Sequence, residues 1–156
     1  MKKLIRVVHL TTVHHPYDPR IYYKQCITLQ RAGYEVTLIA QQTTNQNNNE
    51  NNKLINHIPI KSYNKRWKRM VFGTCDAFRK AKKLNAEIYV FHDPELMFVG
   101  SMLKKRNNIV IYDIHEDYVT SILQKNYLPS LFRNIFATAY KWLEKILTRK
   151  MELSLA

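Results

Sequence analysis

Residues 4–40 have the sequence LIRVVHLTTVHHPYDPRIYYKQCITLQRAGYEVTLIA, and this stretch decides the fold class. The segment 3–12 contains a short apolar run rich in β-branched side chains, which is typical of a buried parallel strand. A helix is predicted over 19–32, because apolar residues recur there at helical spacing and a glycine follows. A second apolar run at 36–40 predicts the next strand, so the stretch forms a right-handed βαβ unit with parallel strands.

The remaining sequence continues this alternation of strands and helices. Segment 41–53 is rich in asparagine and has no apolar side chain, so it is predicted to be a mobile loop. Further strands are predicted at 58–60, 88–91 and 109–112, and further helices at 65–83, 94–106 and 131–150. The alternation predicts one α/β domain over 1–150, with a doubly wound, Rossmann-like parallel sheet. Residues 151–156 are expected to form a tail without the strand that would come next.

The composition is that of a folded and strongly basic chain. Its 25 Lys and Arg face 12 Asp and Glu, which gives a formal net charge of +13. This charge favours an anionic partner, and nucleic acid, acidic lipid headgroups and phosphorylated small molecules all satisfy it. Cys26 and Cys75 lie far apart without a Cys-x-x-Cys pair, which indicates reduced thiols and a cytoplasmic location. The start of the chain is too polar for a secretory signal, and no apolar run approaches the ~18 residues that span a bilayer.

Polar side chains follow the predicted strands directly. Ligands of doubly wound sheets bind at the carboxyl ends of the strands, so these residues are the candidates for a site. They are His14 and His15 after the first strand, His92, Asp93 and Glu95 after the fourth, and His115 and Glu116 after the fifth. Asp93 also suits the N-cap of the following helix, where its carboxylate would accept hydrogen bonds from free amides. No metal-ligand spacing and no Gly-x-Gly-x-x-Gly fingerprint occurs, so neither a metal centre nor classical dinucleotide binding is predicted.

Charged residues also occupy the connection between the first strand and the first helix. Asp18 precedes Pro19 as a helix N-cap should, and Arg20 and Lys24 place cations at the start of the helix. Phosphate oxygens of a ligand could be held there. A solvated charged turn explains the same residues equally well.

Three motifs on this frame resemble the amino-terminal domain of family-4 glycosyltransferases. They are HPYDPRIY at 15–22 with Lys24 and AGYEVTL at 32–38, then HDPEL at 92–96, and finally IYDIHEDY at 111–118. Each motif alone is moderately specific, and the resemblance rests on their common order over nearly all of residues 4 to about 150.

The resemblance implies one half of a two-domain GT-B fold, in which an acceptor-side domain faces a second domain that holds the nucleotide sugar. It implies sugar transfer with retention of configuration and without a metal or other cofactor, in cell-surface polysaccharide or lipid-linked glycan synthesis. His115 matches the family histidine that faces the donor sugar, where it would stabilise the charge of the transition state. Asp93 and Glu116 would orient that histidine or the acceptor hydroxyl. His15, Asp18, Arg20, Lys24, His92 and Glu95 are expected to contribute to substrate binding. The donor-binding domain is absent from the 156 residues, so no activity is assigned to this chain by itself.

The predicted helix over 65–83 is basic and amphipathic. Its first residues, Lys65, Arg66, Trp67, Lys68 and Arg69, are predicted to dock the protein on an anionic membrane at the inner face of the cell envelope. The alternative is an ordinary helix that covers the sheet. A second class of function, a nonenzymatic module that binds nucleic acid or another polyanion, fits the same cations and aromatic residues. No nucleic-acid motif appears, so nucleic acid is not expected as a partner. A noncatalytic remnant that only binds acceptor is a third alternative.

Overall fold

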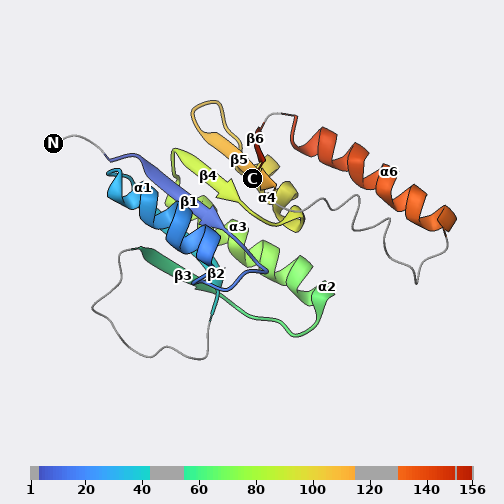
Figure 1. Cartoon of the computed structure of the whole chain (residues 1–156), viewed down its shortest axis with the longest axis horizontal. Coiled ribbons are helices and arrows are strands. Elements are labelled where there is room, and N and C mark those ends of the chain that lie inside the picture. Colours follow the sequence, from blue (N-terminus) through green and yellow to red (C-terminus); the bar gives the residue numbers. More distant parts are fainter. Residues whose placement is uncertain (1–3, 43–54, 115–129, 150, 156) are drawn as a thin grey trace.

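Six strands, all parallel, form the centre of the structure in the order β3-β2-β1-β4-β5-β6 (Figure 1). The computed structural model describes residues 4–42, 55–114, 130–149 and 151–155. The strands are β1 (Arg6–Leu10), β2 (Glu35–Gln41), β3 (Asn56–Ile60), β4 (Ile88–Phe91), β5 (Ile109–Ile114) and β6 (Glu152–Leu155). The direction of winding changes between β1 and β4, which is where a doubly wound sheet opens a crevice for ligands. The predicted Rossmann-like α/β fold is therefore confirmed.

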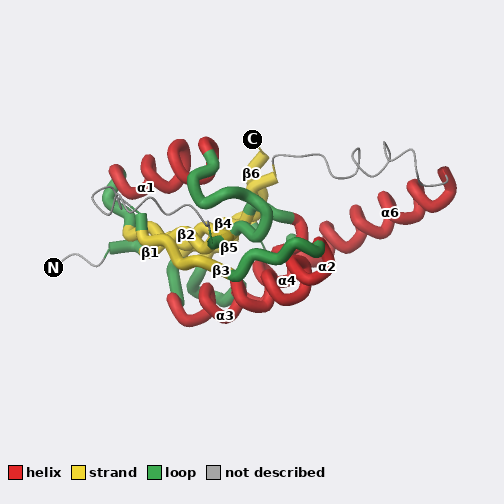
Figure 2. The backbone as a smooth tube through the Cα atoms, turned by 90° about the horizontal axis from the view of Figure 1, so that it is seen from below, coloured by secondary structure: helices red, strands yellow, loops and turns green. Residues whose placement is uncertain are grey.

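Helices cover both faces of the sheet (Figure 2). The π-helical segment η1 (Pro19–Cys26) continues directly into α1 (Ile27–Arg31) on one face. The other face carries α2 (Arg66–Lys68), η3 (Arg69–Gly73) and α3 (Thr74–Leu84), which run as one helix, and then the 3₁₀ turn η4 (Pro94–Leu96) with α4 (Met97–Leu103). The last helix, α6 (Ser130–Leu147), begins far from the sheet and approaches it near its end (Figure 1).

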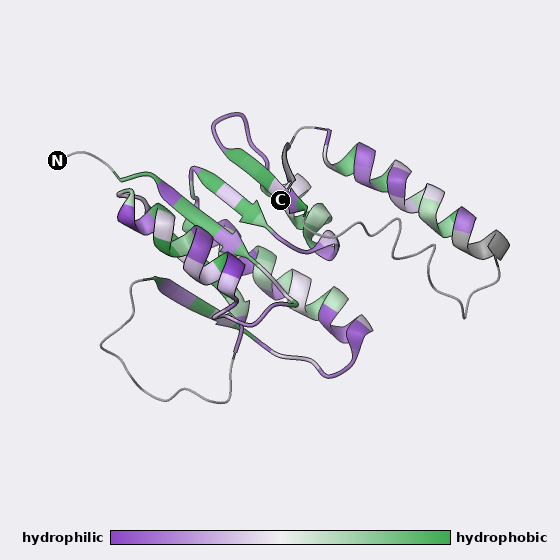
Figure 3. Cartoon of the chain, viewed as in Figure 1, coloured by the Kyte–Doolittle hydropathy of each residue, from purple (hydrophilic) through white to green (hydrophobic). Residues whose placement is uncertain are grey.

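Each face of the sheet has its own apolar core, because side chains alternate along the strands. Val7 faces η1 and α1, where it packs with Ile21, Cys26 and Leu38. Val8 faces α3 and α4, in a larger cluster in which the rings of Phe91 and Tyr112 stack with centroids 4.7 Å apart. Figure 3 shows mainly apolar residues in the central strands and a mixture of polar and apolar residues along the helices. The two cores fix the strand ends, and with them the polar residues that follow.

The element boundaries differ from the sequence prediction in informative ways. β5 continues to Ile114, so Asp113 lies inside the strand and not after it. Gln41, predicted to begin the loop 41–53, is the last residue of β2, and residues 43–53 of that loop lie outside the described part of the chain. α4 ends at Leu103, before the predicted Arg106, because the side chain of Asn108 binds the backbone at this point. Its Nδ2 donates to the Leu103 carbonyl at 2.8 Å, and its Oδ1 accepts from the backbone amide of Lys105 at 2.7 Å.

The expectation of a strandless tail at 151–156 is wrong. β6 pairs in parallel with β5, in a register that aligns Ile111 with Glu152 and Ile114 with Leu155. A free strand edge carries unpaired amides and carbonyls, and a short extended segment that reaches it gains backbone hydrogen bonds irrespective of its apolar pattern. The six-residue segment gave no such signal by itself, because strand pairing depends on what lies next to it.

None of the described helices is long and apolar enough to cross a membrane. In the same part of the chain, no group of His, Cys, Asp and Glu side chains is arranged to hold a metal ion.

Candidate functional site

Asp93, at the end of β4, fixes the chain that follows β1. Its side chain is fully buried. Oδ2 accepts hydrogen bonds from the backbone amides of Thr12 at 2.5 Å and Val13 at 3.2 Å, and from the hydroxyl of Thr11 at 3.0 Å. Asp93 occupies the N-cap position of η4, but its side chain makes no capping hydrogen bond, so the interpretation as a helix cap is wrong. The carboxylate turns to the neighbouring strand instead, because the free amides after β1 offer it more donors.

Glu95 extends this connection to the basic helix. Its Oε1 accepts from the Thr12 hydroxyl at 2.5 Å and lies 3.3 Å from the Nε of Arg69. Gln41 approaches from β2 and donates a hydrogen bond to the carbonyl of Thr12. The turn around Thr12 is thus held by the side chains of Gln41, Asp93 and Glu95. The guanidinium of Arg69 pairs with Glu95, so it faces the site and not the solvent side of its helix.

A second buried cluster lies around Asp113 in β5. Its Oδ2 accepts from His92 Nδ1 at 3.0 Å and from Gln25 Nε2 at 2.8 Å, and its Oδ1 forms an ion pair with Arg20 Nη2 at 2.6 Å. Burial by itself would raise the pKa of Asp113. The hydrogen bonds from His92 and Gln25, with the charge of Arg20, nevertheless hold that pKa well below the usual range of a carboxyl. Asp113 is therefore a carboxylate that ties β4, β5 and η1 together.

His9 completes this cluster from β1. Its Nδ1 lies 3.1 Å from His92 Nε2, and the two rings stack with an interplanar angle of 11°. Burial, reinforced by the neighbouring His92, lowers the pKa of His9 to about 3, so its imidazole is neutral near neutral pH. Within the described part of the chain, His9 Nε2 is buried and has no hydrogen-bond partner. His9 lies in β1, and His92 directly follows the adjacent strand β4, where the winding of the sheet changes direction.

The connection between β1 and η1 brings further charges to this edge. Asp18 caps η1 as predicted, with Oδ1 accepting from the amides of Arg20 and Ile21 at 2.9 Å each. Burial would raise the pKa of Asp18, but these backbone hydrogen bonds lower it. His14 lies between two carboxylates, with Nδ1 3.6 Å from Asp18 Oδ2 and Nε2 3.5 Å from Asp93 Oδ1.

The structure thus gathers part of the predicted site. His92, Asp93, Glu95, Asp18 and Arg20 meet at the carboxyl edge of the sheet, with the pairings given above. His15 and Lys24 are exposed, and Arg20 uses its guanidinium on Asp113, so these cations are not assembled into one phosphate grip by any described contact. His115 and Glu116 lie outside the described residues, directly after the end of β5.

Sequence reasoning missed several residues of this frame. Asp113 had a visible signal, because a carboxylate inside the apolar run at 109–114 needs buried partners. Thr12, Gln25 and Gln41 gave none, because neutral polar residues at strand and helix ends are ordinary, and only the packing of distant segments gives them a role.

The comparisons with known proteins agree with this architecture. No protein-family model matches the chain, and no curated protein matches its sequence. Among solved structures, the chain is similar to a sucrose-phosphate synthase from Thermosynechococcus elongatus, with a TM-score of 0.58 and 14% identity. The similarity covers 97% of this chain and 47% of that one, so the chain spans about half the length of the synthase. The likeness shows that this chain shares its Rossmann-like α/β fold with that part of the synthase.

Proposed function

We propose that this chain is the acceptor-side half of a retaining glycosyltransferase of family 4 that uses a nucleotide sugar. One observation carries the proposal: the motifs that resemble this family contact one another in the fold. Arg20 of the first motif and His92 of the second both bind Asp113 of the third. The parallel sheet brings the ends of β1, β4 and β5 to one edge, and the direct pairing of the motif residues there is the feature that supports the proposal. The fold similarity to half of a sucrose-phosphate synthase supports the same assignment.

The buried polar cluster acts as a frame in this proposal. Both oxygens of Asp113 and Oδ2 of Asp93 accept internal hydrogen bonds, so the two carboxylates position the segments around them. Asp93 Oδ1 has no hydrogen-bond partner among the described residues and lies 3.5 Å from His14 Nε2. Asp113 lies two positions before His115, so the contacts of Asp113 fix the carboxyl end of β5, which His115 directly follows in the sequence. His115 then faces the donor sugar and stabilises the developing charge, and Glu116 orients the acceptor hydroxyl. No metal or other cofactor takes part.

The nucleotide sugar is held mainly by a second domain, and the acceptor by the strand edge of this chain. His15 and Lys24 are exposed at this edge and are available to substrate. We assign the enzyme to cell-surface polysaccharide or lipid-linked glycan synthesis in the cytoplasm. Proximity catalysis needs both substrates held together, so this chain by itself is expected to have no measurable transferase activity.

The start of the basic helix supports docking at an anionic membrane. Large apolar side chains that an ordinary covering helix would bury are about half exposed: Trp67 at 57%, Met70 at 44%, Val71 at 52% and Phe72 at 50%. Lys65 and Arg66 beside them are also exposed, whereas Arg69 pairs with Glu95. Exposed cations next to a tryptophan suit the interface of an anionic bilayer. Docking at this end of the molecule brings a lipid-linked acceptor to the carboxyl edge of the sheet.

The test uses the chain joined to its donor-side domain. Transfer from radiolabelled nucleotide sugars to membrane-derived acceptors is measured for the parent protein and for His115→Ala. We expect turnover to fall more than about 10-fold in the variant, since removal of one group that stabilises transition-state charge costs at least this much.

His57→Gln is the matched control, because His57 lies in β3 and outside the proposed site. Unchanged turnover in His115→Ala removes this residue from the mechanism. Absence of transfer from every nucleotide sugar by the joined protein refutes the proposed function.

A further inference from the structure

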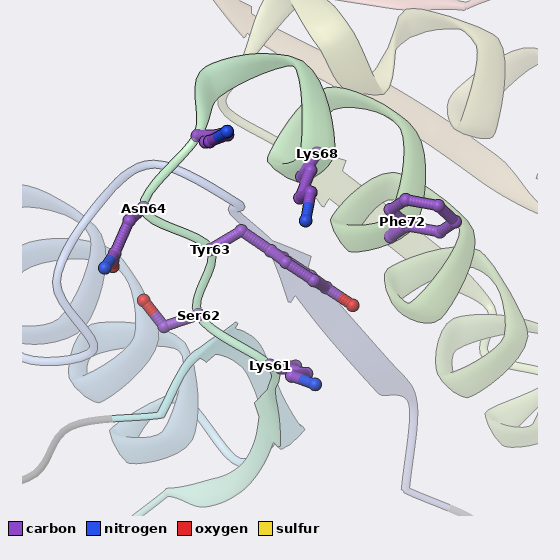
Figure 4. Close-up of a pocket in the computed structure, with 7 residues that line it drawn as sticks. Lys61, Ser62, Tyr63, Asn64, Lys68 and Phe72 are labelled. Atoms are coloured by element: carbon purple, nitrogen blue, oxygen red, sulfur yellow. The ribbon is translucent and has the colours of Figure 1, made fainter.

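A groove opens beside the candidate site, where the chain leaves β3. It has a volume of about 580 Å³ and is lined by Lys61, Ser62, Tyr63, Asn64, Lys65, Lys68 and Phe72 (Figure 4). This volume is within the range of pockets that hold small molecules. The loop after β3 forms one wall, and the start of the helix from α2 to η3 forms the other.

Each wall of the groove carries a lysine and an aromatic ring: Lys61 and Tyr63 on the loop, and Lys68 and Phe72 on the helix. In Figure 4, Lys68 and Phe72 point from the helix toward the ring of Tyr63, while Ser62 and Asn64 point away from it. The rings of Tyr63 and Phe72 have centroids 6.0 Å apart and are tilted by 34°, and Lys61 Nζ lies 5.7 Å from the centroid of the Tyr63 ring. Tyr63 and Lys68 are half-buried and Phe72 is 50% exposed, so the groove has two aromatic rings open to a ligand, with the Lys61 ammonium over Tyr63 and that of Lys68 over Trp67.

The groove is positively charged without compensation. No ion pair of the described residues involves Lys61, Lys65 or Lys68. The nearby carboxylates are already engaged: Glu95 of η4 pairs with Arg69, and Asp76 pairs with Lys80 on α3. Lysines gathered without carboxylates repel one another, and a bound anion relieves this repulsion. The charge therefore points to a ligand with an acidic group.

The groove is connected to the strand edge by a hydrogen-bonded bridge. Gln41 at the end of β2 donates to the carbonyl of Thr12 and accepts from the Ser62 hydroxyl at 3.0 Å. Thr12 is the residue that Asp93 and Glu95 hold, so the first residues of the groove loop are tied to the candidate site. A ligand that extends from the site along this edge enters the groove next.

We propose that this groove is an acceptor subsite for an acidic sugar unit, with a carboxylate or phosphate bound by Lys61 and Lys68 and the sugar ring packed on Tyr63 and Phe72. This proposal rests on the proposed function and gives it a substrate class, a negatively charged glycan. The floor fits an amphipathic ring, because one face of a pyranose is apolar while its hydroxyls need polar partners at the rim. Phe72 borders both this groove and the exposed apolar side chains of Trp67, Met70 and Val71, so the loop residues Lys61 and Tyr63 distinguish the groove from the membrane-docking surface.

The test follows the backbone amides of the isotope-labelled 156-residue chain by NMR during titration with matched ligands. Glucose supplies the ring alone, inorganic phosphate supplies the charge alone, and glucuronate and glucose 6-phosphate carry both. We expect the acidic sugars to shift the amides of Tyr63, Lys68 and Phe72, with affinity about 10-fold above that of glucose or phosphate, as two charge-assisted hydrogen bonds allow. Lys61→Gln with Lys68→Gln should abolish this preference, and Lys82→Gln with Lys83→Gln, the same change of charge on α3, should leave it intact.

Other results overturn the proposal in distinguishable ways. If phosphate binds as well as glucose 6-phosphate, the aromatic floor has no role and the subsite assignment fails. If glucose and the acidic sugars bind equally and shift Thr12 and Glu95 but not the groove, the acidic subsite is refuted while the proposed acceptor site stands. If no sugar shifts any amide along the strand edge, both fail. A thymidine oligonucleotide that shifts the groove amides at lower concentration than the acidic sugars would reassign the groove to nucleic acid.

Discussion

The carboxyl edge of the sheet has two regions that handle charge in opposite ways. Around Asp93 and Asp113, charged and polar groups are buried and almost fully hydrogen-bonded to one another. Around the groove at 61–72, lysines and aromatic rings face solvent without described acidic partners. A buried charge needs its partners to be tolerated, so the contacts of the first region hold the strand ends in place. The lysines of the second region have no ion pair among the described residues, and this is why we propose that region as a subsite for an acidic ligand.

The largest expected effect is a loss of free energy of unfolding when Asp113, the carboxylate at the centre of the buried region, is replaced. Asp113→Ala leaves Arg20 and His92 without their carboxylate, and loss of one partner of a buried pair costs about 3–5 kcal/mol. Urea unfolding followed by circular dichroism measures the change in the free energy of unfolding.

Asp76→Ala is the matched control, because its pair with Lys80 is about 30% exposed on both sides, with side-chain exposures of 31% and 29%. We expect this variant to lose no more than about 0.5 kcal/mol. Equal losses in the two variants would contradict the distinction between a structural and a solvated charge.

A second prediction concerns pH and the buried His9. The pKa of His9 in the folded state is lowered to about 3, so below pH 6.5 His9 binds a proton in the unfolded chain but not in the folded chain. Stability is therefore fully present above pH 6.5 and is lost as the pH falls toward 3. The loss between pH 6.5 and 4 is on the order of 2–3 kcal/mol. Asp113 adds a further loss only below about pH 4, the ordinary pKa of an aspartate, because its folded-state pKa is also depressed.

Unfolding curves of the parent chain and of His9→Gln across this pH range isolate the contribution of His9. The variant should have a flatter profile between pH 6.5 and 4. Parallel profiles would mean that another group causes the acid sensitivity.

The smallest expected effect is on binding to anionic vesicles, and it tests the exposed start of the basic helix as the membrane-docking surface. Arg66→Ser with Trp67→Ser should weaken binding to vesicles that contain anionic lipid by about 10-fold, since each cation near such a surface contributes about 1 kcal/mol. The folded state should be unaffected, because both side chains are exposed. Binding of the parent chain should decrease with added salt and be absent from neutral vesicles.

Lys82→Ser with Phe98→Ser removes one exposed cation and one exposed aromatic elsewhere on the same face of the sheet, and it serves as the control. If both double variants sediment with anionic vesicles equally, the start of the basic helix is not the docking surface.

The difference between the two regions also explains which parts of the site could be predicted. His92, Asp93 and Glu95 were placed at the strand edge, because a polar run after an apolar strand indicates this position. Their partners could not be predicted, and the helix-cap interpretation of Asp93 failed for this reason: local sequence offered one set of amides, and the neighbouring strand offered a better one. The basic helix that forms one wall of the groove was predicted, but the groove itself was not, because its other wall comes from a loop without a motif.

The sequence by itself determined the fold class and the positions of most strands and helices. Those depend on local periodicity, on proline and glycine, and on apolar runs, all of which act between residues close in the chain. Only the tertiary structure decided that β6 pairs with β5, that Asp113 binds Arg20 and His92, and that Gln41 joins Thr12 to Ser62. Each of these contacts joins segments that the chain brings together only after the sheet has formed. A carboxylate or an unpaired strand edge forms hydrogen bonds with the donors and acceptors that the fold brings next to it, and the order of residues in the chain does not specify these partners.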